Sequence, residues 1–81
     1  MNANGFHASD FYRNLEQVLD VDPGTLKGGE ALAGLDAWDS MAVLGFIAMA
    51  DEQYGAMIPP KLIPACRTVD DLADLIRELG K

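Results

Sequence analysis

The feature that most constrains the fold is an uncharged apolar run from Met41 to Ala50, which directly follows Asp39 and Ser40. A short polar segment closes this run and ends in Gly55, a residue type common just after the last turn of a helix. Asp and Ser are favoured at helix N-termini. The sequence therefore predicts a helix from residue 39 or 40 to Tyr54, with the serine hydroxyl at its N-terminal end.

This expected helix is apolar on both faces. At 100° per residue, the face expected to lie in the core carries Val43, Phe46, Ile47, Ala50 and Tyr54. The opposite face carries Met41, Leu44, Gly45, Ala48 and Glu52. A helix of this kind is either fully buried or presents its outer face to a partner, and full burial is difficult in a chain of 81 residues. We therefore expect the outer face to be a docking surface.

Gly45 stands out on that outer face, because a glycine in the middle of a helix costs about 1 kcal/mol relative to alanine. Core packing does not readily explain a glycine that points outward. Close approach of a partner and neutral drift are the two explanations that the sequence leaves open.

Two further helices flank the central one. Ser9 is expected to cap the first of these helices, and Asp22-Pro23-Gly24 is expected to end it. Its apolar residues recur at helical spacing; they are Phe11, Leu15, Val18 and Leu19. Thr68, with Asp71 three residues later, is expected to cap the last helix, and Gly80 is expected to end it. The expected buried stripe of this helix is Val69, Leu72, Ala73, Ile76 and Leu79. Pro59, Pro60 and Pro64 allow only a short helix between them.

Residues 21 to 38 form a long first connection. Apolar residues recur along it, and we expect them to hold it across the helices; they are Val21, Leu26, Leu32 and Leu35. No strand pattern or repeat is present. The sequence predicts an all-α, four-helix bundle with three main helices, one short third helix and a long first loop. We expect one domain over residues 9–81 after a flexible lead, residues 1–8.

Charge and composition exclude several function classes. The formal net charge of −7 disfavours nucleic acid and anionic membranes and favours a basic protein partner. Cys66 is the lone cysteine and His7 the lone histidine, so neither a Ser-His-Asp catalyst nor a metal site is expected. The single cysteine, the lack of a secretory signal and the absence of an apolar run near 20 residues together predict a soluble, cytoplasmic protein.

The stretch Leu35-Asp36-Ala37-Trp38-Asp39-Ser40-Met41 resembles the attachment sequence of the acyl carrier protein family. Glu52-Gln53-Tyr54-Gly55 and Thr68-Val69-Asp70-Asp71-Leu72 resemble the end of that family's second helix and the start of its fourth, so the likeness spans residues 9 to 79. The resemblance implies a stand-alone, non-catalytic carrier with 4'-phosphopantetheine, taken from coenzyme A, on Ser40. It also implies that the phosphopantetheinyl transferase recognises Asp39. Acyl-loading and acyl-transfer or condensing enzymes are the other implied partners, and a monomer is expected.

The chain departs from many fatty-acid carriers, which have acidic residues along the outer face of the second helix. Here Ala42, Gly45 and Ala48 occupy the matching positions, and the only acidic residues left are Asp51 and Glu52, at the far end of the helix. This favours a dedicated fatty acid, polyketide or nonribosomal peptide-like pathway. The expected docking residues are Met41, Leu44, Gly45, Ala48, Asp51 and Glu52. The alternatives are a D-alanyl or other aminoacyl carrier, or an unmodified interaction module of the same fold.

Overall fold

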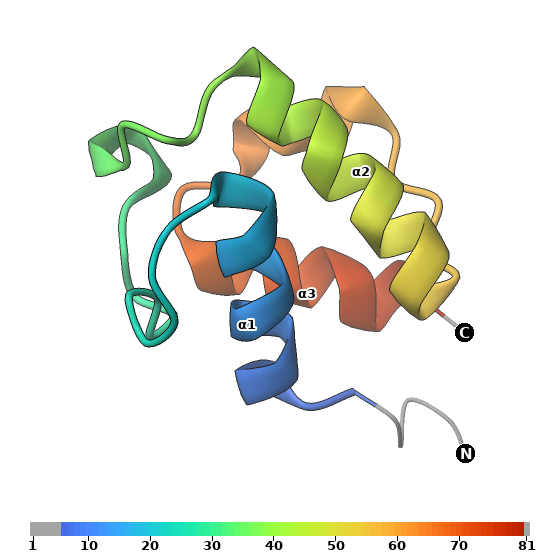
Figure 1. Ribbon diagram of the computed structural model, residues 1–81. Coiled ribbons are helices and arrows are strands. Elements are labelled where there is room, and N and C mark those ends of the chain that lie inside the picture. Colours follow the sequence, from blue (N-terminus) through green and yellow to red (C-terminus); the bar gives the residue numbers. More distant parts are fainter. Residues whose placement is uncertain (1–5, 81) are drawn as a thin grey trace.

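The computed structural model describes residues 6–80 and is built from helices (Figure 1). In chain order the elements are α1 (Ala8–Leu19), the 3₁₀ helix η2 (Leu32–Gly34), α2 (Ser40–Tyr54), the 3₁₀ helix η3 (Pro60–Ala65) and α3 (Val69–Leu79). Within the described range there is no strand, only an isolated antiparallel bridge between Ala31 and Thr68. The predicted all-α bundle, with its short third helix and long first loop, is confirmed; the one-turn η2 inside that loop was not expected.

Helix α1 starts and ends slightly before the expected positions. Its N-cap is His7, which makes no side-chain capping bond, so the expectation that Ser9 caps this helix is wrong. The helix ends at Leu19 because Asp20 adopts the left-handed conformation, at φ 57°, two residues before Asp22. Of the expected flexible lead, residues 1–5 lie outside the described range, and the Phe6 ring packs 5.7 Å from that of Tyr54.

The ends of α2 and α3 follow the local sequence signals. Gly55 ends α2 at φ 64°, a left-handed conformation that glycine adopts without steric cost. Thr68 and Asp71 form the predicted capping box at the start of α3. The side chain of each accepts a hydrogen bond from the backbone N–H of the other. Both boundaries are therefore determined by a few neighbouring residues.

The core lies where the three main helices meet. Phe11 of α1 and Phe46 of α2 are fully buried and meet edge to face, with ring centroids 6.2 Å apart. The buried stripe of α3 is confirmed except at Leu79, which is 37% exposed in the last turn. On α2, Phe46 and Ala50 are buried as expected, but Met49 also enters the core, while Val43, Ile47 and Tyr54 are only half-buried.

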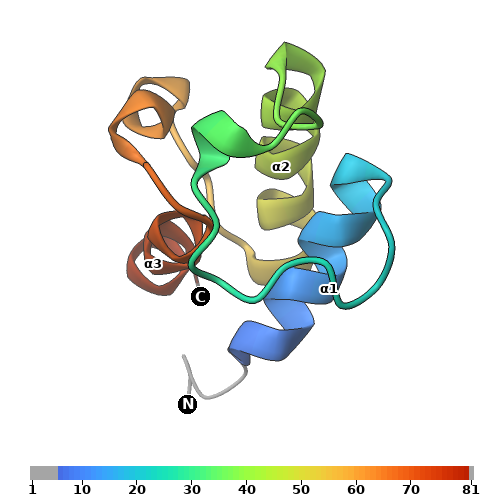
Figure 2. The same cartoon turned by 90° about the vertical axis from the view of Figure 1, so that its left-hand side faces the viewer.

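The long first loop packs across the helices, as its leucines predicted. Leu26 and Leu32 are 1% and 4% exposed. Figure 2 shows the loop passing from the end of α1, by the start of α3, to the start of α2. The middle of the loop pairs with the chain at the start of α3. The Leu32 N–H donates to the Arg67 carbonyl at 2.8 Å, and the Val69 N–H donates to the Glu30 carbonyl at 3.1 Å.

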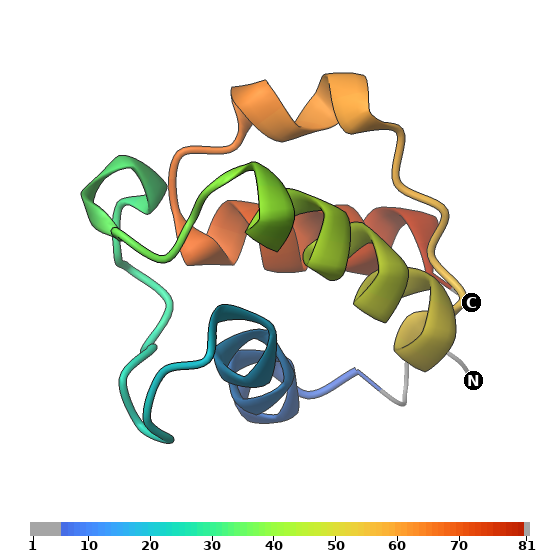
Figure 3. The same ribbon diagram turned by 45° about the horizontal axis from the view of Figure 1, so that its top comes forward.

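Gly28 is required where the loop meets α1 and α3. Its φ is +112°, and a Cβ added there would collide with the Tyr12 hydroxyl and the Asp70 carboxylate. These two groups are joined by a hydrogen bond of 2.6 Å, with the hydroxyl as donor. The loop is thus held close to both helices. On another part of the molecule, η3 lies on the side of α2 opposite α1 (Figure 3).

Candidate functional site

Ser40 is the first residue of α2, and its side chain is exposed. The preceding residue, Asp39, is the N-cap: its backbone is extended, and its Oδ1 accepts a hydrogen bond from the Ala42 N–H at 2.9 Å. The predicted start of this helix is confirmed. The capped end directs the serine hydroxyl outward, and no hydrogen bond to another described residue occupies that hydroxyl.

Trp38 anchors the chain just before this site. Its ring is half-buried and packs edge to face on Phe46, with centroids 6.1 Å apart. The Trp38 N–H donates to the Leu35 carbonyl at 3.0 Å, and the Asp39 N–H donates to that of Ala37 at 3.1 Å. The start of α2 is therefore held by the core on one side and by a tight turn on the other.

The position suits an attached phosphodiester. The N–H groups of Ser40 and Met41 belong to the first turn, which has no intrahelical acceptors, and the N-terminus carries about half a positive charge. Ser40 is exposed, so a phosphate on its oxygen has room outside the core. The residues present therefore fit a covalent 4'-phosphopantetheine group, which would supply a terminal thiol for thioester formation.

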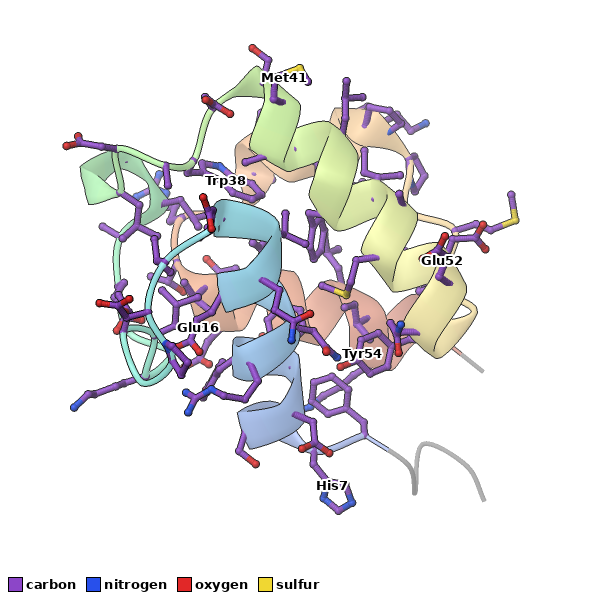
Figure 4. The ribbon with its side chains drawn as sticks, in the orientation of Figure 1. His7, Glu16, Trp38, Met41, Glu52 and Tyr54 are labelled. Carbon is purple, nitrogen blue, oxygen red and sulfur yellow. The ribbon has the colours of Figure 1, made fainter. Side chains whose placement is uncertain are left out.

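The groups of the described range that most often act in catalysis can be located relative to Ser40. His7 lies at the N-cap of α1, and Figure 4 shows it at the opposite end of the molecule from Met41, the residue after the serine. No group of three or more His, Cys, Asp or Glu side chains in residues 6–80 could hold a metal ion. Burial, together with Asp71 and Asp74, raises the pKa of the half-buried Cys66 thiol, which makes it a weaker nucleophile at neutral pH.

Most residues of the expected docking face are exposed. Met41 and Leu44 are 75% and 62% exposed, and Ala48, Asp51 and Glu52 are exposed as well. Two positions were wrongly assigned to the outer side. Ala42 is 5% exposed and belongs to the core, because the buried face of α2 consists of Ala42, Phe46, Met49 and Ala50.

Gly45 is the second correction. A Cβ at this position would lie 3.0 Å from Cγ1 of Val18, on α1. Gly45 therefore faces the neighbouring helix, and its small size allows α1 and α2 to pack closely. This contact explains the glycine without a partner, so we remove Gly45 from the docking face.

Sequence reasoning missed Glu16, the one buried charged residue of the described range, at 2% exposed. Figure 4 shows Glu16 between α1 and the first loop. Its carboxylate accepts hydrogen bonds from the N–H groups of Gly24 and Leu26 and pairs with Arg13. The available signal of burial was that Glu16 directly follows the apolar Leu15 on α1. The hydrogen-bond partners of Glu16 lie in the loop, however, and the helical pattern of α1 does not reveal them. Met57, 79% exposed between α2 and η3, was also missed.

A compact helical bundle with an exposed serine at the capped start of its central helix defines a carrier-type protein. A family model described as a phosphopantetheine attachment site matches residues 10–76. The chain belongs to this family, whose members carry covalently attached 4'-phosphopantetheine and are generally not catalysts themselves. Searches of curated proteins and of solved structures gave no significant match. None of the described helices has the length and apolar character needed to cross a membrane.

Proposed function

We propose that this protein is a stand-alone acyl carrier whose 4'-phosphopantetheine arm is attached to the Ser40 hydroxyl. The arm's thiol would hold acyl or aminoacyl intermediates as thioesters while partner enzymes act on them. The observation that carries the proposal is the position of Ser40, exposed at a capped helix N-terminus within the matched residues. The lone histidine, His7, lies at the other end of the molecule, which is consistent with activation of the hydroxyl by a separate transferase.

Asp39 has two roles in this proposal. Its carboxylate caps α2 through the Ala42 N–H, which fixes the helix start that presents the serine. Its second oxygen makes no hydrogen bond to a described residue and can meet the phosphopantetheinyl transferase or that enzyme's metal ion. Capping and recognition use different oxygens, so the two roles are compatible.

Partner enzymes would dock on the exposed side of α2. Met41 and Leu44 provide large apolar contacts next to the serine, and Ala48 leaves the helix flat beyond them. Asp51 and Glu52 add negative charge near the C-terminal end. This arrangement favours a dedicated fatty acid, polyketide or nonribosomal peptide-like pathway, with a loading enzyme and an acyl-transfer or condensing enzyme as partners. We further propose that the protein acts as a monomer in the cytoplasm, without catalysis of its own.

The test is conversion followed by loading. The protein is incubated with coenzyme A and a broad-specificity phosphopantetheinyl transferase, and the intact mass is measured. The converted form is then offered acyl and aminoacyl groups, D-alanine included, with activating enzymes of each class. Gain of one phosphopantetheine and of one class of thioester would establish the carrier role and its cargo. A folded protein that gains neither would favour the unmodified interaction module.

A further inference from the structure

Trp38 packs the chain that enters α2 against the middle of that helix. Its ring centroid lies 6.1 Å from that of Phe46, edge to face, and Phe46 in turn lies edge to face on Phe11 of α1 at 6.2 Å. Phe46 and Phe11 are fully buried, whereas Trp38 is half-buried. Three aromatic rings thus connect the segment just before Ser40 to the centre of the core.

This contact is a longer form of the hydrophobic staple. In a staple, the residue before the N-cap packs on the fourth residue of the helix and fixes the angle at which the chain enters. The N-cap of α2 is Asp39, so Trp38 is the residue before it, but its ring lies against Phe46, the seventh residue of the helix. Because Phe46 is fully buried, the entering chain is fixed to the core as well as to α2.

The hydrogen bonds at the start of α2 are local by comparison. The Asp39 carbonyl accepts the Val43 N–H at 3.0 Å, which closes the first turn, and the Asp39 side chain caps the same turn. These bonds join residues within one turn, so they stabilise the turn without fixing where it lies. Of residues 36–41, Ala37 and Trp38 pack against the hydrophobic core. Trp38 is much the larger side chain and therefore has the greater part in placing this turn.

We propose that Trp38 is a positioning residue for attachment of the arm, because its packing holds the Ser40 hydroxyl where a transferase can use it. The inference rests on the proposed carrier function. In the transfer, the serine oxygen bonds to the phosphorus that carries the pantetheine. The bond from that phosphorus to the nucleotide part of coenzyme A breaks, and the hydroxyl proton passes to the transferase. A displacement of about 1 Å can slow such a step about 100-fold. Trp38 takes no part in bond making and acts through the place of the first turn.

The first measurement is amide hydrogen exchange of the unmodified protein, because it reports on the start of α2 without a transferase. Trp38→Ala should raise the exchange rate of the Val43 N–H about tenfold through local opening. The Gly55 N–H, which donates to the Asp51 carbonyl at 3.1 Å at the other end of α2, should exchange as in the native protein. Trp38→Phe, which keeps an aromatic edge for Phe46, should restore slow exchange at Val43. Equal acceleration at both ends of α2, or none at Val43, would overturn the proposal.

The second measurement is the kinetics of arm transfer with coenzyme A and a broad-specificity transferase. A misplaced hydroxyl slows the chemical step, so Trp38→Ala should lower kcat about tenfold while KM changes less than about twofold. Trp38→Phe should recover most of the loss. Ile76→Val, in the core on α3, is the control for lost packing alone and should leave both constants near the native values. Assays are run well below the unfolding midpoint of every variant, so that the folded population is the same.

The outcomes separate this inference from the proposed function. If the native protein gains no arm, the carrier function fails, and the inference fails with it. If the native protein gains the arm and Trp38→Ala gains it with the same kcat, the carrier function stands and the positioning role of Trp38 is refuted. A rise in KM with unchanged kcat would instead assign Trp38 to direct contact with the transferase and would equally refute it. A loss of kcat that Trp38→Phe restores, with faster exchange confined to the start of α2, supports the proposal.

Discussion

Oε2 of Glu16, on α1, accepts a hydrogen bond from the Leu26 N–H at 2.8 Å and so links the first helix to the first part of the long loop. The same oxygen accepts the Gly24 N–H at 3.0 Å, while Oε1 lies 2.7 Å from Nε of Arg13. A buried carboxylate with three partners holds a segment that has little secondary structure of its own. The first part of the loop that leads toward Ser40 is thus fixed by one side chain.

Replacing Glu16 should therefore destabilise the fold. We expect Glu16→Ala to lower the free energy of unfolding by about 2–4 kcal/mol, because the buried Leu26 N–H and the partly buried Gly24 N–H lose their acceptor. Glu16→Gln keeps an acceptor oxygen and should cost about 1 kcal/mol. Urea unfolding followed by circular dichroism measures both, with the exposed neighbour Gln17→Ala as control. Equal stability of all three variants would contradict the role of Glu16.

Substitutions at Asp39 separate capping from recognition. Asp39→Ala should lower the stability by about 1 kcal/mol, whereas Asp39→Asn, which can still accept the Ala42 N–H, should be nearly neutral. If the transferase reads the carboxylate, Asp39→Asn will nevertheless reduce the kcat/KM for modification. Thermal unfolding and the initial rate of arm transfer are measured on the same samples. An unchanged rate for Asp39→Asn would leave capping as the sole role.

The contact between Gly45 and Val18 predicts a coupled pair of substitutions. Gly45→Ala gains about 1 kcal/mol of helix propensity but places a methyl group 3.0 Å from the Val18 side chain, so its net effect in the native background should be near zero. In a Val18→Ala background the same change should stabilise by about 1 kcal/mol. A double-mutant cycle of unfolding free energies gives the coupling. Additive effects would show that the two positions do not interact.

Acid should loosen the pairing between the first loop and α3. The N–H groups of Arg67 and Thr68 lower the pKa of Asp71 below 3.8. At Glu30 burial raises the pKa, but backbone hydrogen bonds, including those from Lys27 and Gly28, more than offset it, so the pKa lies below 4.5. Both groups therefore contribute stability that is complete above those ordinary values and is lost as pH falls through the lower values of the folded protein.

The measurement for this prediction is the unfolding midpoint between about pH 6 and 2. Asp71→Asn and Glu30→Gln should each flatten the loss of stability in acid, because the neutral amide cannot be protonated in that range. The exposed Glu78→Gln is the control. An unaltered pH profile in both variants would assign the acid sensitivity to other groups.

Local signals were sufficient for the parts of the site that depend on neighbouring residues. The start of α2 at Ser40, its end at Gly55 and the Thr68 cap of α3 each follow from a few consecutive side chains. The orientation of Gly45 could not be predicted in this way, because it depends on Val18, a residue of another helix. The buried state of Glu16 likewise depends on loop N–H groups that the helical pattern of α1 does not reveal.

A groove beside α2, lined by Ile47, Asp51, Met57, Ile58 and Pro59, was missed for a related reason. Its walls come from α2 and from the segment after it, and they become neighbours only when the chain turns at Gly55. A pattern computed along α2 alone includes Ile47 and Asp51 but not Met57 or Ile58. The sequence therefore predicted the apolar face next to Ser40 but not its continuation beyond the end of the helix.

The most direct test of the carrier account is to locate the arm. The chain contains two serines, Ser40 and Ser9, and Ser9 lies in the first turn of α1, so Ser9→Ala is a matched control for Ser40→Ala. After incubation with coenzyme A and transferase, peptide mass spectrometry should find one phosphopantetheine on the peptide that contains Ser40, in the native and Ser9→Ala proteins alike. Ser40→Ala should gain none. An arm on another residue, or none on folded native protein with any transferase tested, would contradict the account.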